Sequence, residues 1–218
     1  MNIIFDETKA TPLCDIMGRN RSDKGSINIL KSWHNYTTFY YTYFKDIQYK
    51  SLRIFELGLG TNNTLLPSNM GADGIPGASL YAWAEFFENS EIFGADIDKD
   101  ILFNNSRIQT YYCDQTNPDI IKKMWDEPAL NDKFDFILDD GLHTFKANWC
   151  FFENSIHKLT RDGIYIIEDI LNNEIPLFYD IINNEAKLKY PQLSFSLLKI
   201  PSVVNKFDNN LIIIKYNN

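Results

Sequence analysis

Two acidic strand ends hold side chains that could do chemistry together. The segment "FDFILDDGLH" ends an apolar strand in Asp139 and Asp140 and places His143 three residues after Asp140. A second apolar segment, "GIYIIEDI", ends in Glu168 and Asp169. Adjacent carboxylates repel one another, and each is costly to bury without a cation or a proton. The two segments therefore indicate a cation site with an imidazole beside it.

The ligand types favour a hard divalent cation. Asp140, Glu168 and Asp169 offer only oxygen, which suits Mg²⁺ and also Ca²⁺ or Mn²⁺. We predict these three residues as the metal ligands, with Asp140 and His143 as the catalytic residues. His143 fits better as a base beside the metal than as a ligand. Because neighbours on a strand point to opposite sides, Asp139 should face the cofactor side or cap a helix.

A glycine turn and two further acids indicate a cofactor site. In "ELGLG", Glu56 is followed by Gly58 and Gly60, which let the backbone approach a ligand closely. The next strand ends at Asp96, placed to accept hydrogen bonds from ribose hydroxyls, and the third ends at Asp114, which could accept from an exocyclic amine. The glycine spacing is not a full GxGxxG, which argues against a nicotinamide dehydrogenase.

Alternating strands and helices should position these residues. Apolar strand segments at 53–60, 91–98, 108–114, 134–140 and 163–170 alternate with helical patterns. This order predicts an α/β fold with a mainly parallel sheet. The last two segments, "LSFSLLKI" and "NLIIIKY", have no helix between them, so they should form an antiparallel hairpin at one edge. Ligands of such sheets bind beyond the carboxyl ends of the strands, where the acids lie.

Two other segments could cover the site. We interpret residues 1–50 as an N-terminal helical or lid segment and 51–218 as the catalytic domain. The segment "TNNTLLPSNMGADGIPGASL" is long for a connection between strand and helix, and we expect it to lie over the ligand. Several aromatic side chains could line an apolar pocket there or simply pack in the core. They are Tyr36, Tyr40, Tyr43 and Trp83.

Composition excludes several classes of protein. With 218 residues and a net charge of −8, the chain does not resemble a basic nucleic-acid binder. No apolar run approaches the roughly 20 residues that span a membrane. Three cysteines without CxxC spacing predict reduced thiols in a cytoplasmic protein. The basic group Arg19, Arg21 and Lys24 is either a solvated loop or a contact for a phosphorylated substrate.

The motifs resemble a known superfamily. The order of glycine turn, ribose acid and adenine acid resembles class I S-adenosylmethionine-dependent methyltransferases. "LDDGLH" followed by "IIED" resembles the metal-dependent sugar O-methyltransferases of macrocin and mycinamicin type, and is similar to the cephalosporin hydroxylase and rhamnosyl methyltransferase family. "SDKGS" and "HNYTTFYYTYF" resemble the segment before that family's core. The likeness covers most of residues 22–170.

This resemblance implies a Rossmann-like class I methyltransferase fold with a C-terminal antiparallel hairpin. It places the family's metal ligands on Asp140, Glu168 and Asp169 and its general base on His143. The acid before the glycine turn would lie near the methionine part of the cofactor. The expected cofactor contacts are Glu56, Gly58, Gly60, Ser79, Asp96 and Asp114.

The function expected from the sequence is methyl transfer to a hydroxyl of a sugar or sugar-like metabolite, in surface-polysaccharide or natural-product assembly. S-Adenosylmethionine and Mg²⁺ would be the cofactors. An acceptor that is phosphorylated, nucleotide-linked or catechol-like would suit the same site. A non-catalytic protein that binds S-adenosylmethionine, or a dehydrogenase, is disfavoured by the acid cluster. The oligomeric state is left open, and neither a nucleic acid nor a membrane is an expected partner.

Overall fold

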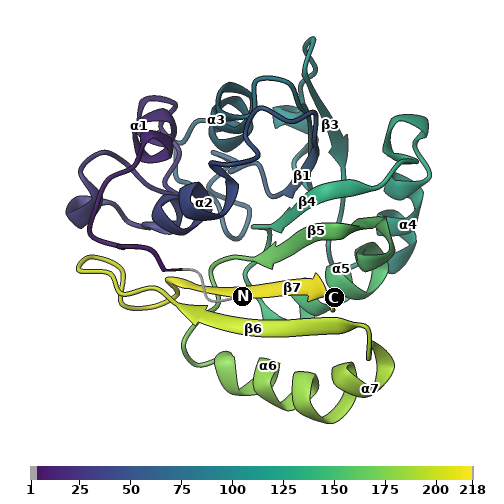
Figure 1. Cartoon of the computed structure of the whole chain (residues 1–218). Helices are drawn as coiled ribbons and strands as arrows, with labels where there is room; N and C mark the ends of the chain where they lie inside the picture. The colour runs from purple at the N-terminus through teal and green to yellow at the C-terminus, as the bar shows by residue number, and fades with distance from the viewer. Residues whose placement is uncertain (1–3, 218) are drawn as a thin grey trace.

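Seven strands form one sheet in the computed structural model, which describes residues 4–217 (Figure 1). The strands are β1 (Arg53–Leu57), β2 (Glu91–Asp96), β3 (Ile108–Tyr112), β4 (Phe134–Asp139), β5 (Leu159–Ile167), β6 (Leu193–Lys199) and β7 (Asn210–Tyr216). Their order across the sheet is β3-β2-β1-β4-β5-β7-β6. The first five are parallel, and β7 runs antiparallel between β5 and β6. The predicted parallel sheet with a C-terminal antiparallel hairpin is confirmed.

Helices cover both faces of this sheet (Figure 1). One face carries α1 (Pro12–Arg19), α2 (Tyr36–Phe44) and α3 (Ala78–Phe86), and the other carries α4 (Pro118–Trp125) and α5 (Phe145–Ser155). Beyond them lie α6 (Ile175–Ile181), a π-helical turn (Ile182–Ala186) and α7 (Lys187–Lys189). Short 3₁₀ turns lie at Ile29–Lys31, Lys99–Ile101, Pro128–Leu130 and Ile156–Lys158. The connection between β2 and β3, where the alternation of strands and helices predicts a helix, thus holds one 3₁₀ turn.

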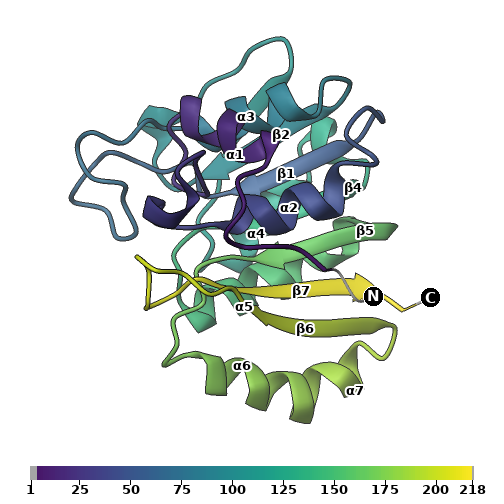
Figure 2. The same ribbon diagram turned by 60° about the vertical axis from the view of Figure 1, so that its left-hand side comes forward.

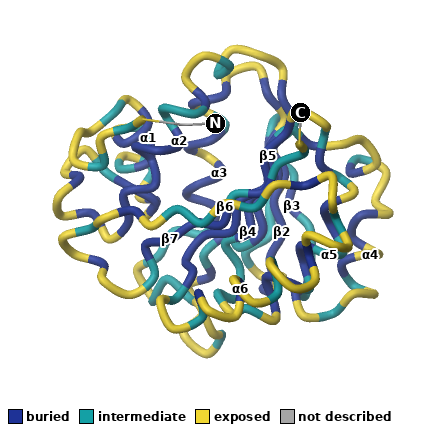
Figure 3. The backbone as a smooth tube through the Cα atoms, turned by 60° about the horizontal axis from the view of Figure 1, so that its bottom comes forward, coloured by how far each residue is buried: buried dark blue, intermediate teal, exposed yellow. Residues whose placement is uncertain are grey.

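The apolar sequence of the central strands explains this layering. In β4, Phe134 and Ile137 lie in the core under α4 and α5, whereas Phe136 and Leu138 lie in the core under α2 and α3. A strand that is buried on both faces reads as a continuous apolar run, as β4 does. Figure 3 shows the buried strands at the centre of the molecule, between exposed loops.

Local hydrogen bonds and a proline fix where α4 and one 3₁₀ turn begin. Asn117 caps α4 because its side chain accepts hydrogen bonds from the backbone N–H groups of Asp119 and Ile120. Pro118 occupies the first helical position, where its missing N–H costs nothing. Asp98 likewise accepts from the N–H of Asp100 and caps the 3₁₀ turn after β2.

The N-terminal helices pack on the sheet itself. Rings of Tyr40 and Phe44 in α2 contact Phe136 of β4, with centroids 5.9 and 4.8 Å apart. Leu13 and Met17 of α1 belong to the same buried cluster. Figure 2 shows α2 beside β1 and β4. The loop between α1 and α2 consequently reaches the carboxyl ends of the strands. Among the described residues, no helix has the length and apolar character needed to cross a bilayer.

Candidate active site

The two acidic strand ends meet at one rim of the sheet. β4 and β5 are hydrogen-bonded neighbours, and β1 lies on the other side of β4. Backbone hydrogen bonds continue the pairing beyond the strands, since the N–H of Asp140 donates to Leu57 (2.9 Å) and that of Glu168 donates to Asp139 (2.9 Å). The predicted proximity of these two segments is confirmed.

A cavity of about 490 Å³ opens at this rim, within the usual size range for small-molecule sites. Most of the residues predicted for the site line it. They are Gly58, Gly60, Ser79, Asp96, Asp114, Asp140, His143 and Asp169. Glu56 and Glu168 do not line it and are fully buried. The long loop after β1 contributes Pro67–Met70 to the wall, and Ser68 Oγ donates to the carbonyl of Leu142 (2.9 Å).

The glycine turn lines the cavity. Gly58 and Gly60 have φ angles of 91° and 74°, in the left-handed region that favours glycine. A Cβ on Gly58 would overlap the carbonyl oxygen of Asp140. Asp96 Oδ2 accepts from the N–H of Leu59 (2.7 Å), and burial raises the pKa of Asp96. Because each carboxylate oxygen has two lone pairs, Asp96 can still accept from a ligand hydroxyl.

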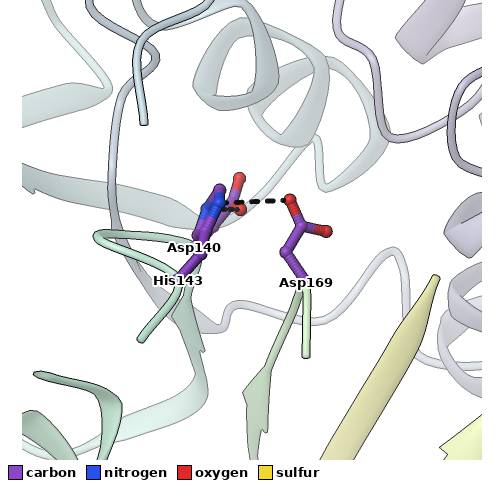
Figure 4. Close-up of side chains that lie close together, drawn as sticks. All are labelled: Asp140, His143 and Asp169. Atoms are coloured by element: carbon purple, nitrogen blue, oxygen red, sulfur yellow. Dashed lines mark hydrogen bonds and ion pairs between the residues drawn. The ribbon is translucent and has the colours of Figure 1, made fainter. Parts of the chain in front are cut away.

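The cavity is also lined by a cluster of Asp140, His143 and Asp169 (Figure 4). One potential ligand atom from each lies within 4.8 Å of the others. His143 Nε2 is 3.1 Å from Asp140 Oδ1, and Nδ1 is 3.6 Å from Asp169 Oδ2. His143 and Asp169 have positive φ angles of 57° and 55°, which are uncommon outside glycine and cluster at functional sites.

Electrostatics keep His143 protonated between its two acids. Burial lowers the pKa of the imidazole, but Asp169 and Asp140 outweigh burial and raise it to about 10. At neutral pH the ring is therefore an imidazolium beside two carboxylates, of which Asp140 also forms an ion pair with Lys24. Two carboxylates within reach of one point offer the oxygen ligands that a hard divalent cation prefers.

Glu168, the third predicted metal ligand, lies apart from this cluster. Its Oε1 accepts from Tyr40 Oη (2.6 Å), and its Oε2 forms an ion pair with Lys24. Tyr36 Oη donates to Asp169 Oδ1 (2.7 Å). Both tyrosine rings are buried in the core and do not line the cavity, so the core-packing interpretation is confirmed and a role for them in the cavity wall is wrong. Ligation by Glu168 stays a prediction.

Curated proteins with similar sequences are sugar O-methyltransferases, although no family model matches the chain. An L-olivosyl-oleandolide 3-O-methyltransferase of Streptomyces antibioticus is 28% identical over 176 residues, which are 80% of this chain. A rhamnosyl-tetracenomycin-C 3'-O-methyltransferase of Streptomyces olivaceus is 26% identical over 155 residues, 71% of this chain. The chain spans only 41% and 36% of the lengths of these two relatives.

Solved structures decide the fold. The mycinamycin-pathway methyltransferase MycE, solved with Mg and SAH, superposes with a TM-score of 0.71 and 19% identity over 97% of this chain and 56% of its own. SAH-bound Podospora anserina PaMTH1 gives a TM-score of 0.54 at 14% identity, over 100% of this chain and 91% of its own. The fold is that of a class I methyltransferase. The resemblance to sugar O-methyltransferases drawn from the motifs is also confirmed.

Within this methyltransferase fold, Glu56 lies just behind the glycine turn. Its Oε1 accepts from Ser79 Oγ (2.7 Å) and its Oε2 accepts from Trp83 Nε1 (2.6 Å). Burial raises the pKa of Glu56. Ser79 faces the cavity, so Glu56 could act on a cofactor through Ser79; direct contact with the cofactor stays a prediction.

Asp139 supports the loop that carries His143. It is fully buried, and its Oδ1 accepts from Gln115 Nε2 (2.6 Å) and from the N–H of Gly141 (3.3 Å). Gln115 Oε1 in turn accepts from the N–H of Leu142 (2.7 Å). Burial raises the pKa of Asp139 to about 7. Asp139 and Asp140 thus differ in surroundings, as the strand alternation predicts.

Two residues at this site, Lys24 and His34, were not predicted for it from the sequence. Lys24 is 2% exposed and pairs with Asp140 and Glu168, so neither a solvated loop nor a phosphate contact describes it. Arg19 ends α1, is half exposed and pairs with Asp15 and Glu85 outside the cavity, which agrees with the solvated alternative. His34, which had no distinctive neighbours in the sequence, places Nε2 3.5 Å from Asp169 Oδ1. The only signal for Lys24 and His34 was their place in the segments that carry the family resemblance.

Proposed function

We propose that this chain transfers a methyl group from S-adenosylmethionine to a hydroxyl of a sugar or a sugar-bearing small molecule. The observation that carries the proposal is one cavity that is lined both by a glycine turn with Asp96 and by the Asp140–His143–Asp169 cluster. The named relatives methylate sugar hydroxyls, and MycE was solved with Mg, SAH and mycinamycin VI, which supports this choice of donor and acceptor.

Cofactor binding would use the part of the cavity that is lined by the glycine turn, Asp96 and Asp114. Gly58 and Gly60 leave room for the methionine part beside the turn, Asp96 would accept from the ribose hydroxyls, and Asp114 would accept from the adenine amine. The sulfonium methyl would then point to the half that holds Asp140 and His143. Transfer depends on holding the acceptor oxygen in line with that methyl group.

The acid cluster fits a hard divalent cation. Asp140 and Asp169, with Glu168 as the motifs predict, would hold Mg²⁺, which when bound lowers the pKa of a hydroxyl that it contacts. The pKa of about 10 follows from the negative charges of Asp169 and Asp140 beside the His143 ring. Neutralising them would lower that pKa, and the neutral imidazole could then take the proton of the acceptor hydroxyl.

The acceptor would occupy the second half, between the cluster and the cavity mouth. Asp23, Trp33 and Asp208 line the cavity, and we assign them to this part. Carboxylates accept hydrogen bonds from sugar hydroxyls, and an indole face packs against the C–H face of a sugar ring. Trp33 is 45% exposed and therefore available to a ligand.

Replacing Trp33 with alanine should raise KM for the acceptor about tenfold, equivalent to roughly 1.4 kcal/mol of lost contact. The dissociation constant of S-adenosylmethionine should change little, since Trp33 is assigned to the acceptor part of the cavity and not to the cofactor contacts. Tyr81→Ala is the matched control, because Tyr81 is 42% exposed and stacks on Phe103 away from the cavity. Steady-state kinetics of both variants check this. An unchanged acceptor KM in the Trp33 variant would remove it from the acceptor site.

The function is tested by following tritium from methyl-labelled S-adenosylmethionine into a panel of acceptors. The panel should hold olivosyl and rhamnosyl glycosides, sugar phosphates and catechols. We expect label in a sugar hydroxyl with Mg²⁺ present and none after EDTA treatment. Label only in catechols or phosphates would overturn the acceptor class, and full activity in EDTA would overturn the metal. Calorimetry that detects NADH binding but no S-adenosylmethionine binding would overturn methyl transfer altogether.

A further inference from the structure

A buried lysine lies among the acids of the site, and methyl transfer as described above does not use it. Lys24 is 2% exposed. Its Nζ forms ion pairs with Asp140 Oδ2 and Glu168 Oε2 and lies 3.4 Å from Glu56 Oε1. Among the ion pairs of residues 4–217, no other lysine or arginine reaches any of these three acids. The lysine thus joins the acid behind the cofactor turn to two of the acids predicted to bind metal.

Charge balance gives this contact its importance. Glu56 and Glu168 are fully buried, and the side chain of Asp140 is 19% exposed. Buried carboxylates that lack a cation repel one another and lose their hydration. Hydrogen bonds from Ser79, Trp83 and Tyr40 satisfy some of their oxygens but bring no positive charge. One ammonium group therefore neutralises part of the cluster in the metal-free protein.

The backbone that presents Lys24 is held in place. The N–H of Thr37, in α2, donates to the carbonyl of Lys24 (3.3 Å), and the N–H of Ser22 donates to Met17 of α1 (3.0 Å). A Cβ on the neighbouring Gly25 would collide with the Thr37 side chain, so the segment packs closely on α2. The lysine reaches the acids from a segment fixed at both sides, and not from a free loop.

We propose that Lys24 is the resident counter-ion of this site, a positioning residue that keeps Glu56, Asp140 and Glu168 together when no divalent cation is bound. It also links the N-terminal segment to Glu56, behind the glycine turn, and to Asp140 and Glu168. The proposal rests on the proposed function only in assigning Glu56 to the cofactor site and the other two acids to the metal site. Replacing Lys24 with a neutral side chain leaves the acids without their cation, so the fold should become dependent on a divalent ion.

The test compares melting temperatures in EDTA and in saturating Mg²⁺ for the parent chain, Lys24→Met and Lys158→Met. Lys158 is the matched control, because its Nζ donates to the carbonyls of Trp125 (3.1 Å) and Leu130 (2.8 Å) and contacts no acid of the site. In EDTA we expect Lys24→Met to melt about 10 °C lower than the parent. Mg²⁺ should restore most of that loss and should not restore the loss in Lys158→Met. An equal Mg²⁺ effect on the parent and on Lys24→Met would overturn the proposal.

A charge-compensated variant keeps the test decisive if Lys24→Met does not fold. In Lys24→Met/Glu168→Gln, one acid leaves with the lysine, and this double variant should melt higher in EDTA than Lys24→Met. A double variant that melts lower, or that also fails to fold, would overturn the proposal. Lys24→Arg keeps the charge and should stay closer to the parent than Lys24→Met. Because melting involves no methyl donor or acceptor, these outcomes are independent of whether the chain proves to be a methyltransferase.

Discussion

Alanine in place of His143 should lower kcat by about 10²–10⁴-fold, the usual contribution of a general base. The dissociation constant of S-adenosylmethionine should stay close to that of the parent, since His143 is not among the expected cofactor contacts. For Asp140→Asn we likewise expect a loss of kcat with little change in the dissociation constant of S-adenosylmethionine. The amide keeps the shape of the carboxylate but loses its charge. Single-turnover kinetics and calorimetry measure the two quantities.

His157→Ala is the control for this experiment. His157 belongs to a 3₁₀ turn after α5, does not line the cavity, and should leave kcat unchanged. If His143→Ala kept the parental kcat, the base would have to be another group. If it lost affinity for S-adenosylmethionine in proportion to kcat, His143 would instead be a cofactor contact.

Gly58→Ala should remove most cofactor binding. At φ 91° any side chain strains the backbone by roughly 1–2 kcal/mol. The added Cβ would also overlap the carbonyl of Asp140, the residue that joins the two halves of the site. We therefore expect the dissociation constant of S-adenosylmethionine to rise well over tenfold, which corresponds to more than about 1.4 kcal/mol.

Gly71→Ala separates overlap from backbone strain. Gly71 has φ 73°, but a Cβ there meets no atom within 4 Å. It should lose stability through strain alone and keep its affinity for the cofactor. Calorimetric titration of both variants with S-adenosylhomocysteine measures the difference. Equal affinities in the two variants would show that the close approach of the glycine turn to Asp140 is not needed for binding.

Much of this site could be predicted because it follows from strand pairing. Asp140 and Glu168 end consecutive parallel strands, and the carboxyl ends of such strands meet at one rim. The different surroundings of Asp139 and Asp140 follow from the alternation of side chains along a strand. The caps at Asn117 and Asp98 follow from local hydrogen bonding. Each of these inferences needs only near neighbours in the sequence or the period of a strand.

The remaining contacts depend on packing between distant segments. Lys24 meets Asp140 and Glu168 only because α1 and α2 pack on the sheet, and no pattern near Lys24 encodes that approach. His34 lies beside Asp169 for the same reason. The side chain of Glu168 turns to Tyr40 and Lys24, a choice of rotamer that depends on partners far away in the chain. A charged residue in a polar segment reads as solvated unless the fold that buries it is known.

A crystal structure with S-adenosylhomocysteine is the most direct measurement. We expect the ligand in the cavity beyond β1, β2 and β4, with its ribose hydroxyls within hydrogen-bonding distance of Asp96. Its sulfur should face the half of the cavity that holds Asp140 and His143, which leaves the space between them for an acceptor hydroxyl. A ligand bound elsewhere, or one whose sulfur points away from these two residues, would contradict the proposed methyl transfer.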